Sequence, residues 1–550
     1  MSLRSKLGWG WRRLRRGNAF APAPTGYRPV KVVLGARRAG RALGRARGND
    51  LVLVAPDVAL SAAQVDVLQT AAYAADDHAR GAVCARELDA DGTVRSVGLF
   101  RDPNFPDALC DRYRGRPGDD GAANAMVPVL AASGACLYLR RDAIEAAGGL
   151  DPAASPADAC LRLWRAGRGV VAWPELSVTR TAPSTPPALG REWERWLDDR
   201  DVRTDEGRLR IVYVTQDTGI GGGHRVVFEH CNGLAARGHD VELWSLGGPP
   251  GWFDLRVPVR TFDGYGPLEA ALEPLDAIKV ATWWETARPV WLASVRHGIG
   301  AHFVQDIETS YYPDDEWHWG TILASYREEL RTLTTSGWNR ERLAALGLNA
   351  DAVPPGVDLE QFRELSGVER RPDRILALGR SQPLKNLPLT LEAAALVPGA
   401  ELVLFGSEPD LGREHGVAYV ERPSDDEVNE LLNDAAVFVQ TSHHEGFCLP
   451  PLEAMAAGCP VVCTDAHGNR DYSVDGENCL MPEASVEAVA AAIARVLADD
   501  ALCERLVAGG RRTAAEYGWE PRIDALEHFY ARTATTLHPH GDRHPAADRG

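Results

Sequence analysis

The sequence predicts an α/β protein of several domains, two of which contain doubly wound parallel sheets. The chain has 550 residues, whereas a single hydrophobic core rarely serves more than about 250–300 residues, so several domains are expected. Hydrophobic residues make up 45% of the chain and charged residues 25%, which is typical of globular proteins and not of disordered, fibrous or membrane-embedded ones. Short apolar strand patterns alternate with helical patterns over residues 209–530, as in parallel sheets covered by helices.

This alternation occurs in two separate stretches. In the first, a helical pattern at 227–238 joins strand patterns at 210–214 and 241–246. In the second, residues 374–406 repeat the same order. Two such domains in tandem leave a cleft between the carboxyl ends of their strands, where doubly wound sheets bind ligands.

The other boundaries follow from composition. Residues 191–208 are highly charged and suit a linker helix, and residues 537–550 are rich in His, Pro and Asp, which favours disorder. We therefore expect a basic arm at 1–29, a first α/β domain at 30–187, a linker at 188–208, two doubly wound domains at 209–355 and 356–535, and a disordered tail at 536–550.

Charge is distributed unevenly along the chain. Residues 1–49 contain 13 basic and no acidic residues, while the rest of the chain contains 47 basic and 77 acidic residues. An acidic body argues against nucleic-acid binding, which requires a basic surface. Residues 1–17 have no apolar stretch and are not a secretory signal. Two interpretations of this arm stay open: contact with anionic lipids at the inner face of the cell membrane, or a disordered solubilising segment.

The cysteines indicate the compartment. The ten cysteines are scattered and form no CxxC pair, which predicts a reduced, cytoplasmic protein without a structural zinc site. No metal-ligand cluster is visible in the sequence either.

The most specific motif is a pair of glutamates between two strand patterns. Glu445 lies in a strand–helix loop, and Glu453 lies early in the helix that Pro450 and Pro451 open. The backbone of Gly446 and Phe447 is expected to approach a ligand closely, since Gly446 has no Cβ. Carboxylates repel phosphate, so we expect them to accept hydrogen bonds from sugar hydroxyls.

A second motif places two cations in another strand–helix loop. Arg380 follows the strand pattern at 375–378, and Lys385 and Asn386 follow five and six residues later. Two cations at this spacing are suited to flank a diphosphate and to stabilise it as a leaving group. The alternative is a solvated surface pair.

The first doubly wound domain offers two further candidate loops. A glycine run that includes Gly222 and Gly223 precedes His224 and a helix, which permits close approach to a pyrophosphate, although a flexible turn explains it too. Asp306, Glu308 and Tyr311 belong to a polar, aromatic loop after the strand pattern that ends at 304. Two hypotheses stay open for this loop. Either Asp306 or Glu308 orients or deprotonates the hydroxyl group of a substrate that acts as acceptor, or the Asp306 side chain holds its own loop in place.

The stretch from Glu445 to Val462 resembles the nucleotide-sugar signature of family 4 glycosyltransferases, which have two Rossmann-like domains in the arrangement called GT-B. The resemblance covers residues 209–530 and includes the Arg380 and Lys385 pair. It implies that Glu453 binds the nucleotide ribose, that Glu445 contacts the transferred sugar, and that the two cations hold the donor diphosphate. It also implies a retaining reaction, and the loop at 302–313 resembles a subgroup that includes bacterial surface-glycan rhamnosyltransferases.

The first domain resembles part of a different family. Residues 30–181 look like the later part of a family 2 glycosyltransferase of the GT-A type. Where that family has an Asn-x-Asp metal segment, this chain keeps only Asp57. Where it has a catalytic Glu-Asp pair, this chain has Ser155-Pro156, with Asp158 further on. We therefore expect a truncated, inactive GT-A-like domain that serves as scaffold or docks the acceptor. The alternative is a second active transferase.

Taken together, the motifs predict a retaining glycosyltransferase of cell-surface polysaccharide synthesis. Its expected partners are a nucleoside-diphosphate sugar and a glycan or lipid-linked acceptor, with no cofactor and no metal. Three alternatives stay open: a non-catalytic glycan-binding or assembly protein made of worn transferase modules, a bifunctional transferase, and a nucleotide-sugar epimerase. Expected catalytic residues are Glu445, Arg380, Lys385 and Asp306, expected donor-binding residues are Glu453, Gly446, Phe447, Gly222, Gly223 and Asn386, and expected acceptor-side residues are Glu308, Tyr311 and His224.

Overall fold

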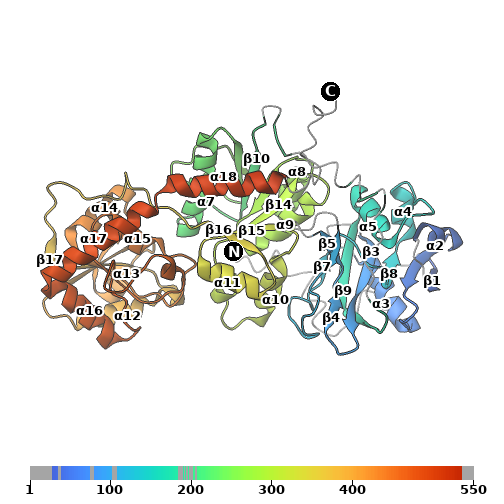
Figure 1. The fold of residues 1–550 in the computed structure, drawn as a ribbon, viewed down its shortest axis with the longest axis horizontal. Coiled ribbons are helices and arrows are strands. Elements are labelled where there is room, and N and C mark those ends of the chain that lie inside the picture. Colours follow the sequence, from blue (N-terminus) through green and yellow to red (C-terminus); the bar gives the residue numbers. More distant parts are fainter. Residues whose placement is uncertain are drawn as a thin grey trace, which may run out of the picture.

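A computed structural model of the chain contains three sheet-bearing bodies arranged in a row (Figure 1). The structure describes residues 28–34, 39–46, 48–74, 80–101, 108–183, 190, 192–193, 196, 202–204 and 207–535. The tail expected at 536–550 and nearly all of the basic arm expected at 1–29 lie outside the described residues.

The first body is an α/β domain with a mixed sheet of order β1-β2-β8-β3-β9-β7, in which β4 also pairs with β3. Its strands are β1 (Val30–Leu34), β2 (Asp50–Val54), β3 (Arg80–Asp89), β4 (Val94–Ser96), β7 (Val127–Pro128), β8 (Cys136–Leu139) and β9 (Gly169–Arg180), and β5 (Leu99–Arg101) and β6 (Leu109–Asp111) form a separate pair. Its helices are α2 (Ala39–Arg45), α3 (Ala62–Tyr73), α4 (Arg141–Ala146) and α5 (Pro156–Arg165). Antiparallel pairing of β8 with β2 and β3 distinguishes this sheet from the other two.

The middle body is a doubly wound domain whose seven strands are all parallel, in the order β12-β11-β10-β13-β14-β15-β16. The strands are β10 (Arg210–Thr215), β11 (Asp240–Ser245), β12 (Val259–Thr261), β13 (Ile278–Ala281), β14 (Ile299–Val304), β15 (Arg331–Thr334) and β16 (Ala350–Ala352). Its helices are α7 (Gly222–Ala236), α8 (Tyr265–Leu272), α9 (Trp284–Ser294), α10 (Glu316–Ser325) and α11 (Gly337–Ala345).

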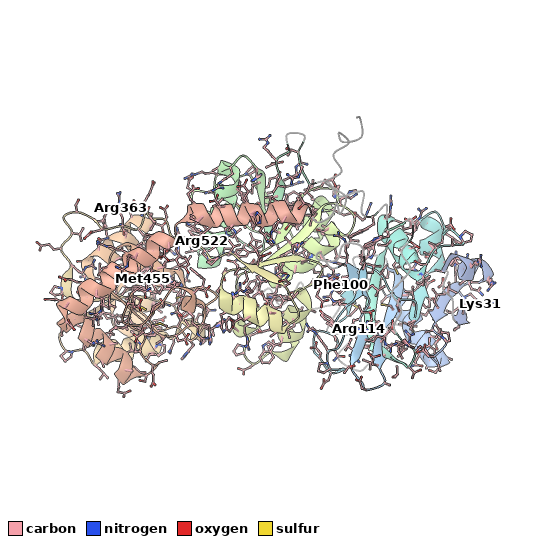
Figure 2. The ribbon with its side chains drawn as sticks, in the orientation of Figure 1. Lys31, Phe100, Arg114, Arg363, Met455 and Arg522 are labelled. Carbon is pink, nitrogen blue, oxygen red and sulfur yellow. The ribbon has the colours of Figure 1, made fainter. Side chains whose placement is uncertain are left out.

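The third body is a smaller parallel sheet of order β19-β18-β17-β20-β21. Its strands are β17 (Arg371–Leu378), β18 (Glu401–Gly406), β19 (Ala418–Glu421), β20 (Ala435–Gln440) and β21 (Val461–Cys463). Its helices are α12 (Leu387–Ala395), α13 (Leu411–His415), α14 (Asp425–Asp434), α15 (Leu449–Ala456), α16 (Val486–Ala498) and α17 (Asp500–Glu516). Met455 of α15 lies inside this body (Figure 2). The predicted pair of Rossmann-like α/β domains is thereby confirmed.

The last helix, α18 (Trp519–Thr535), returns to the middle domain (Figure 1). Its apolar side chains, among them Ile523, Leu526 and Phe529, belong to the core beneath β10 and α7. The Tyr530 hydroxyl donates to the Tyr213 hydroxyl at 2.8 Å. The sequence-based boundary at 535 assigns this helix to the C-terminal domain, whereas its packing joins it to the middle one.

The N-terminal and middle domains share one hydrophobic core. Trp164 and Trp291 meet edge to face, with ring centroids 5.7 Å apart. Beside them the buried Glu329 carboxylate accepts from Arg112 at 3.0 Å and from Arg327 at 2.7 Å. Because breaking such a buried network leaves uncompensated charge, we infer that these two domains stay together as one unit.

The linker helix expected at 191–208 falls largely outside the described residues. Trp193 and Trp196, which are described, are buried and stack with ring centroids 5.2 Å apart. Both belong to the core shared by the N-terminal and middle domains. In the part of the chain that the structure describes, no helix is both long and apolar enough to cross a membrane.

Candidate functional site

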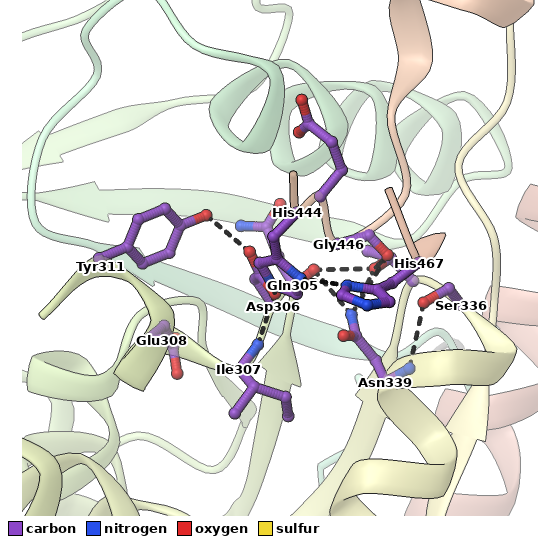
Figure 3. Close-up of polar contacts among 12 residues, drawn as sticks. Gln305, Asp306, Ile307, Glu308, Tyr311, Ser336, Asn339, His444, Gly446 and His467 are labelled. Carbon is purple, nitrogen blue, oxygen red and sulfur yellow. Dashed lines mark hydrogen bonds and ion pairs between the residues drawn. The ribbon is translucent and has the colours of Figure 1, made fainter. Parts of the chain in front are cut away.

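The middle and C-terminal domains meet at the carboxyl ends of their strands. Gly446, in the loop after β20, lies so close to the middle domain that an added Cβ would be 2.1 Å from the Gln305 carbonyl oxygen. The Gly446 carbonyl accepts from the Thr335 hydroxyl at 3.2 Å and from the Asn339 amide at 3.4 Å (Figure 3). Only glycine fits at this approach, so Gly446 joins the domains through its backbone.

Lys385 and Glu445 form an ion pair at the edge of this contact. The Lys385 Nζ lies 2.6 Å from Glu445 Oε2, and Ser442 donates to Glu445 Oε1 at 2.8 Å. Burial lowers the pKa of Lys385, but the charge of Glu445 outweighs burial, so the pKa lies above its ordinary value. The structure therefore brings together two residues that lie in separate sequence motifs.

Glu453 lies in α15, whose N-terminus follows the Glu445 loop. Cys448, the residue before the helix, has a left-handed backbone with φ 73°, and this turns the chain sharply into α15. Burial raises the pKa of Glu453 to about 7, against the opposing influence of Arg225. Within the described residues, no group donates a hydrogen bond to the half-buried Glu453 carboxylate. It is therefore available to accept hydrogen bonds from a ligand.

Arg225 of α7 bridges the two domains near Glu453. Its guanidinium binds both oxygens of Asp425, at 2.9 and 2.6 Å, across 200 residues of sequence. Arg225 also lies over the rings of Trp252 and Phe253. Burial lowers the pKa of Arg225, but the hydrogen bond to Asp425 and the charge of Glu453 outweigh burial, so the pKa lies above its ordinary value. Sequence reasoning missed this residue, because its partner is in a different domain.

Arg380 and Asn386 complete the loop that follows β17. Arg380 is half-buried, and the described part of the chain gives it neither an ion pair nor a hydrogen bond. Asn386 adopts a left-handed backbone with φ 51°, which asparagine tolerates, and its carbonyl accepts from Thr441 at 3.0 Å. The turn at Asn386 connects the Lys385 segment to α12.

The glycine run of the middle domain lies at the start of α7. Gly222 and Gly223 form its first turn, and an added Cβ on Gly223 would lie 3.0 Å from the Gln305 side chain. His224 Nδ1 lies 2.8 Å from the Gly219 carbonyl, so the imidazole holds its own loop. These residues occupy the same edge of the sheet as Gln305.

Asp306 connects three segments at the contact between the middle and C-terminal domains, a region called the cleft below (Figure 3). Its Oδ1 lies 2.7 Å from His444 Nε2 of the C-terminal domain, and its Oδ2 accepts from the Tyr311 hydroxyl at 2.9 Å. It also accepts from the Ile307 amide at 2.7 Å. Asp306 therefore both holds its own loop and contacts the opposite domain. His444 in turn meets His467, with their Nδ1 atoms 3.0 Å apart.

Two predicted site residues are placed away from the cleft. Glu308 is buried, points away from the cluster around His444 and accepts from the Tyr326 hydroxyl (Figure 3). Burial raises the pKa of Glu308 to about 8. The Phe447 ring packs in the core against Tyr472 and Tyr517, so its backbone alone faces the Gly446 contact.

The N-terminal domain uses its remaining acidic motif residues internally. Asp57 accepts from Arg180 Nε at 3.0 Å and from the amides of Thr181 and Ala182, each at 2.9 Å. Burial raises the pKa of Asp57, but these hydrogen bonds outweigh it and hold the pKa well below its ordinary value. Asp158 accepts from the Ser155 amide at 2.9 Å and forms a capping box for α5. No group of three or more potential metal ligands occurs among the described residues.

Comparisons with known proteins agree with this geometry. The family description "Glycosyltransferase Family 4" matches residues 220–361, and "Glycosyl transferases group 1" matches residues 359–513. The D-inositol 3-phosphate glycosyltransferase of Geodermatophilus obscurus is 36% identical over 217 residues, 34% of this chain and 48% of the relative. The phosphatidyl-myo-inositol mannosyltransferase of Mycobacterium leprae is 29% identical over 217 residues, 36% of this chain and 57% of the relative. The chain thus spans about half the length of these curated relatives.

Solved structures show the same arrangement of domains. Sucrose-phosphate synthase from Thermosynechococcus elongatus matches with a TM-score of 0.52 at 19% identity, over 59% of this chain and 99% of that one. HepE of Anabaena, solved with UDP-glucose, matches with a TM-score of 0.51 at 15% identity, over 58% of this chain and 99% of that one. At these identities the likeness establishes the fold. Residues 220–361 thus resemble family 4 glycosyltransferases and residues 359–513 resemble group 1 glycosyl transferases, and the two Rossmann-like domains have the GT-B arrangement.

Proposed function

We propose that the chain is a glycosyltransferase that moves a sugar from a nucleoside-diphosphate sugar to a glycan or lipid-linked acceptor in bacterial cell-surface polysaccharide synthesis. The observation that carries this proposal is the half-buried Glu453 carboxylate, to which no group among the described residues donates a hydrogen bond, in the helix that follows the Glu445 loop. A ribose offers two adjacent hydroxyls that can donate to one carboxylate. These hydrogen bonds would replace those to water that the Glu453 carboxylate loses on burial.

We propose that the cations Arg380 and Lys385 receive the diphosphate. Arg380 and Lys385 follow the same strand, β17, so both cations lie in one strand–helix loop. Preorganised positive charge of this kind stabilises a leaving diphosphate without a metal. Because Lys385 is paired with Glu445, we propose that donor binding transfers part of the Lys385 interaction to phosphate and frees Glu445 to orient the sugar.

The transfer step then exchanges one bond for another. The bond between the anomeric carbon and the diphosphate oxygen breaks, and the acceptor oxygen bonds to the anomeric carbon on the same face. The acceptor proton passes to the departing diphosphate. Retention of configuration is what the family resemblance implies. Asp306, already held by His444 and Tyr311, positions the acceptor side of the cleft.

For the N-terminal domain we propose a scaffold role. The hydrogen bonds to Asp57 from Arg180 and two amides occupy the carboxylate that a GT-A metal site would need. The core shared with the middle domain supports the same interpretation. All ten cysteines are free, which supports a reducing, cytoplasmic location as part of the proposal. Membrane contact through the basic arm remains a proposal too.

The experiment is a release assay with a panel of nucleotide sugars, starting with UDP-glucose because HepE was solved with it. We expect the wild-type chain to release nucleotide from one donor, and Glu453→Gln to lose that release with an intact circular dichroism spectrum. The matched control is Glu430→Gln, an exposed glutamate on α14. Failure to bind any nucleotide would indicate an assembly protein, and interconversion of the sugar at C2 without acceptor would indicate an epimerase.

A further inference from the structure

An aromatic pair of exposed Tyr311 and half-buried Trp283 lies at the carboxyl edge of the middle sheet. β13 and β14 are adjacent and parallel, Trp283 follows β13, and Tyr311 lies in the loop after β14. The two rings are 5.8 Å apart with an interplanar angle of 46°. Tyr311 keeps 38% of its surface exposed, so part of its ring is open to contact with a ligand.

A carboxylate that the proposed transfer does not use lies in α9, the helix that begins directly after Trp283. Glu285, in the first turn of α9, is half-buried and is contacted by the Tyr265 hydroxyl at a long 3.4 Å. Burial raises the pKa of Glu285. Asp217 influences the same Tyr265 hydroxyl, so a second carboxylate is close by. Polar atoms that are partly desolvated and weakly bonded are suited to receive ligand hydroxyls.

This cluster lies beside the reacting end of the donor site. The Tyr311 hydroxyl donates to Asp306, and Asp306 meets His444 of the opposite domain (Figure 3). The charge of Glu445 also acts on Tyr311, raising its pKa together with the effects of burial and of Asp306. A ring placed on Tyr311 would therefore be next to the sugar that Glu445 is proposed to orient.

We propose that Trp283, Glu285 and Tyr311 form the acceptor subsite and that it takes an uncharged sugar ring. The inference rests on the proposed transferase function and names the substrate class of its second site. The faces of a sugar ring carry C–H groups, which suit the negative faces of aromatic rings, and its hydroxyls suit carboxylates.

Charge argues against a phosphate at this position. Within the described residues, no lysine or arginine side chain forms an ion pair, hydrogen bond or cation–π contact with Trp283, Glu285 or Tyr311. The ionisable groups that act on them are the carboxylates Asp306, Glu308 and Glu445, the Tyr265 hydroxyl, and the imidazole of His318, which is itself paired with Asp315 at 2.6 Å. A lipid phosphate would be repelled here, whereas an uncharged glycan would not.

The test measures binding of uncharged methyl glycosides of glucose, galactose, mannose and rhamnose by saturation-transfer difference NMR, with the full chain and saturating UDP. We expect at least one glycoside to bind. Trp283→Ala and Glu285→Gln should each weaken its affinity about tenfold, because each variant loses one aromatic contact or one charged hydrogen bond. Trp283→Phe keeps an aromatic face and should restore part of the affinity.

The control variant is Trp319→Ala, which removes another exposed aromatic ring of the same domain, outside the Trp283–Tyr311 pair. UDP affinity should stay unchanged in all variants. Glycoside binding that is equal in wild type and in both subsite variants would overturn the proposal, as would binding of phosphatidylglycerol vesicles in preference to glycosides. Loss of UDP binding by the wild type would instead overturn the transferase function itself.

Discussion

The N-terminal domain and the cleft hold similar charged groups in different states. In the N-terminal domain, Arg180 reaches Asp57 at 3.0 Å and Glu87 at 2.8 Å, and Ser133 donates to Glu87 as well. In the cleft, the described residues leave the Glu453 carboxylate without a hydrogen-bond donor and Arg380 without an anion. The first set of charges is satisfied within the protein, while the second still lacks ligands.

Whether a charged side chain has partners within the protein distinguishes a structural role from a ligand-binding role, even when the residue types are the same. A carboxylate that accepts an arginine and two amides gains stability from them and has little capacity left for a ligand. A half-buried carboxylate without a donor costs stability until something binds it. The comparison predicts that substitutions in the N-terminal set will change folding, and that substitutions in the cleft will change binding and turnover.

The largest expected effect is on turnover when a cleft cation is removed. Lys385→Ala should lower the rate of nucleotide release about 100-fold to 1,000-fold, the usual loss of one preorganised electrostatic contact to a developing charge. Steady-state kinetics with the donor found by the panel measure this. Arg413→Ala, an exposed cation of the same domain, is the control. A change below about threefold would contradict the proposed role of Lys385.

Substitutions among Asp57, Glu87 and Arg180 of the N-terminal domain should lower stability and leave turnover unchanged. Asp57→Ala leaves Arg180 without one of its two carboxylate partners, and we expect the free energy of unfolding to fall by about 2 kcal/mol. Denaturant unfolding followed by circular dichroism measures this loss. Turnover per folded molecule should stay the same, and a loss of turnover without a loss of stability would point to an active N-terminal domain.

Glu453 should make nucleotide affinity depend on pH. Its pKa is raised to about 7, so the carboxylate is mostly protonated at pH 6 and mostly charged at pH 8. If the charged form binds ribose, UDP affinity should rise about tenfold between these values, following the charged fraction. Calorimetry over this range measures it, and Glu453→Gln should remove this dependence. A wild-type profile identical to that of the variant would exclude Glu453 from the ribose contact.

The smallest expected effect concerns the bridge between the domains. Arg225 and Asp425 side chains are 21% and 38% exposed, so their pair should contribute only about 0.5–1 kcal/mol. A double-mutant cycle on Arg225→Ala and Asp425→Ala, read out as UDP affinity, isolates this coupling energy. A coupling energy near zero would mean that the bridge does not bias the cleft toward the arrangement seen here.

The sequence predicts local features well and contacts between domains poorly. The alternation of strands and helices is confirmed, and Glu453 does lie in the predicted helix, although at the fifth of its eight residues and not in its first turn. The Arg225–Asp425 bridge spans 200 residues, and no local pattern reports it. The Asp306–His444 contact spans 138 residues, and no local pattern predicts it either.

Burial explains the other differences. Glu308 and Tyr311 lie three residues apart in one polar loop, yet Glu308 is 1% exposed and Tyr311 38%. The short helical turn at 308–311 sends one side chain toward Tyr326 and leaves the other at the surface. Likewise, α18 continues directly from the C-terminal domain, and only its packing against β10 and α7 shows which core it joins.

The central claim is that transfer occurs in the cleft and that the N-terminal domain supports it without reacting. The most direct test compares nucleotide release by two double variants, Glu445→Ala with Glu453→Ala, and Asp57→Asn with Glu87→Gln. We predict that the cleft variant loses release while the N-terminal variant, assayed as folded protein, retains it. Release that survives in the cleft variant and disappears in the N-terminal variant would contradict the claim and assign the chemistry to the first domain.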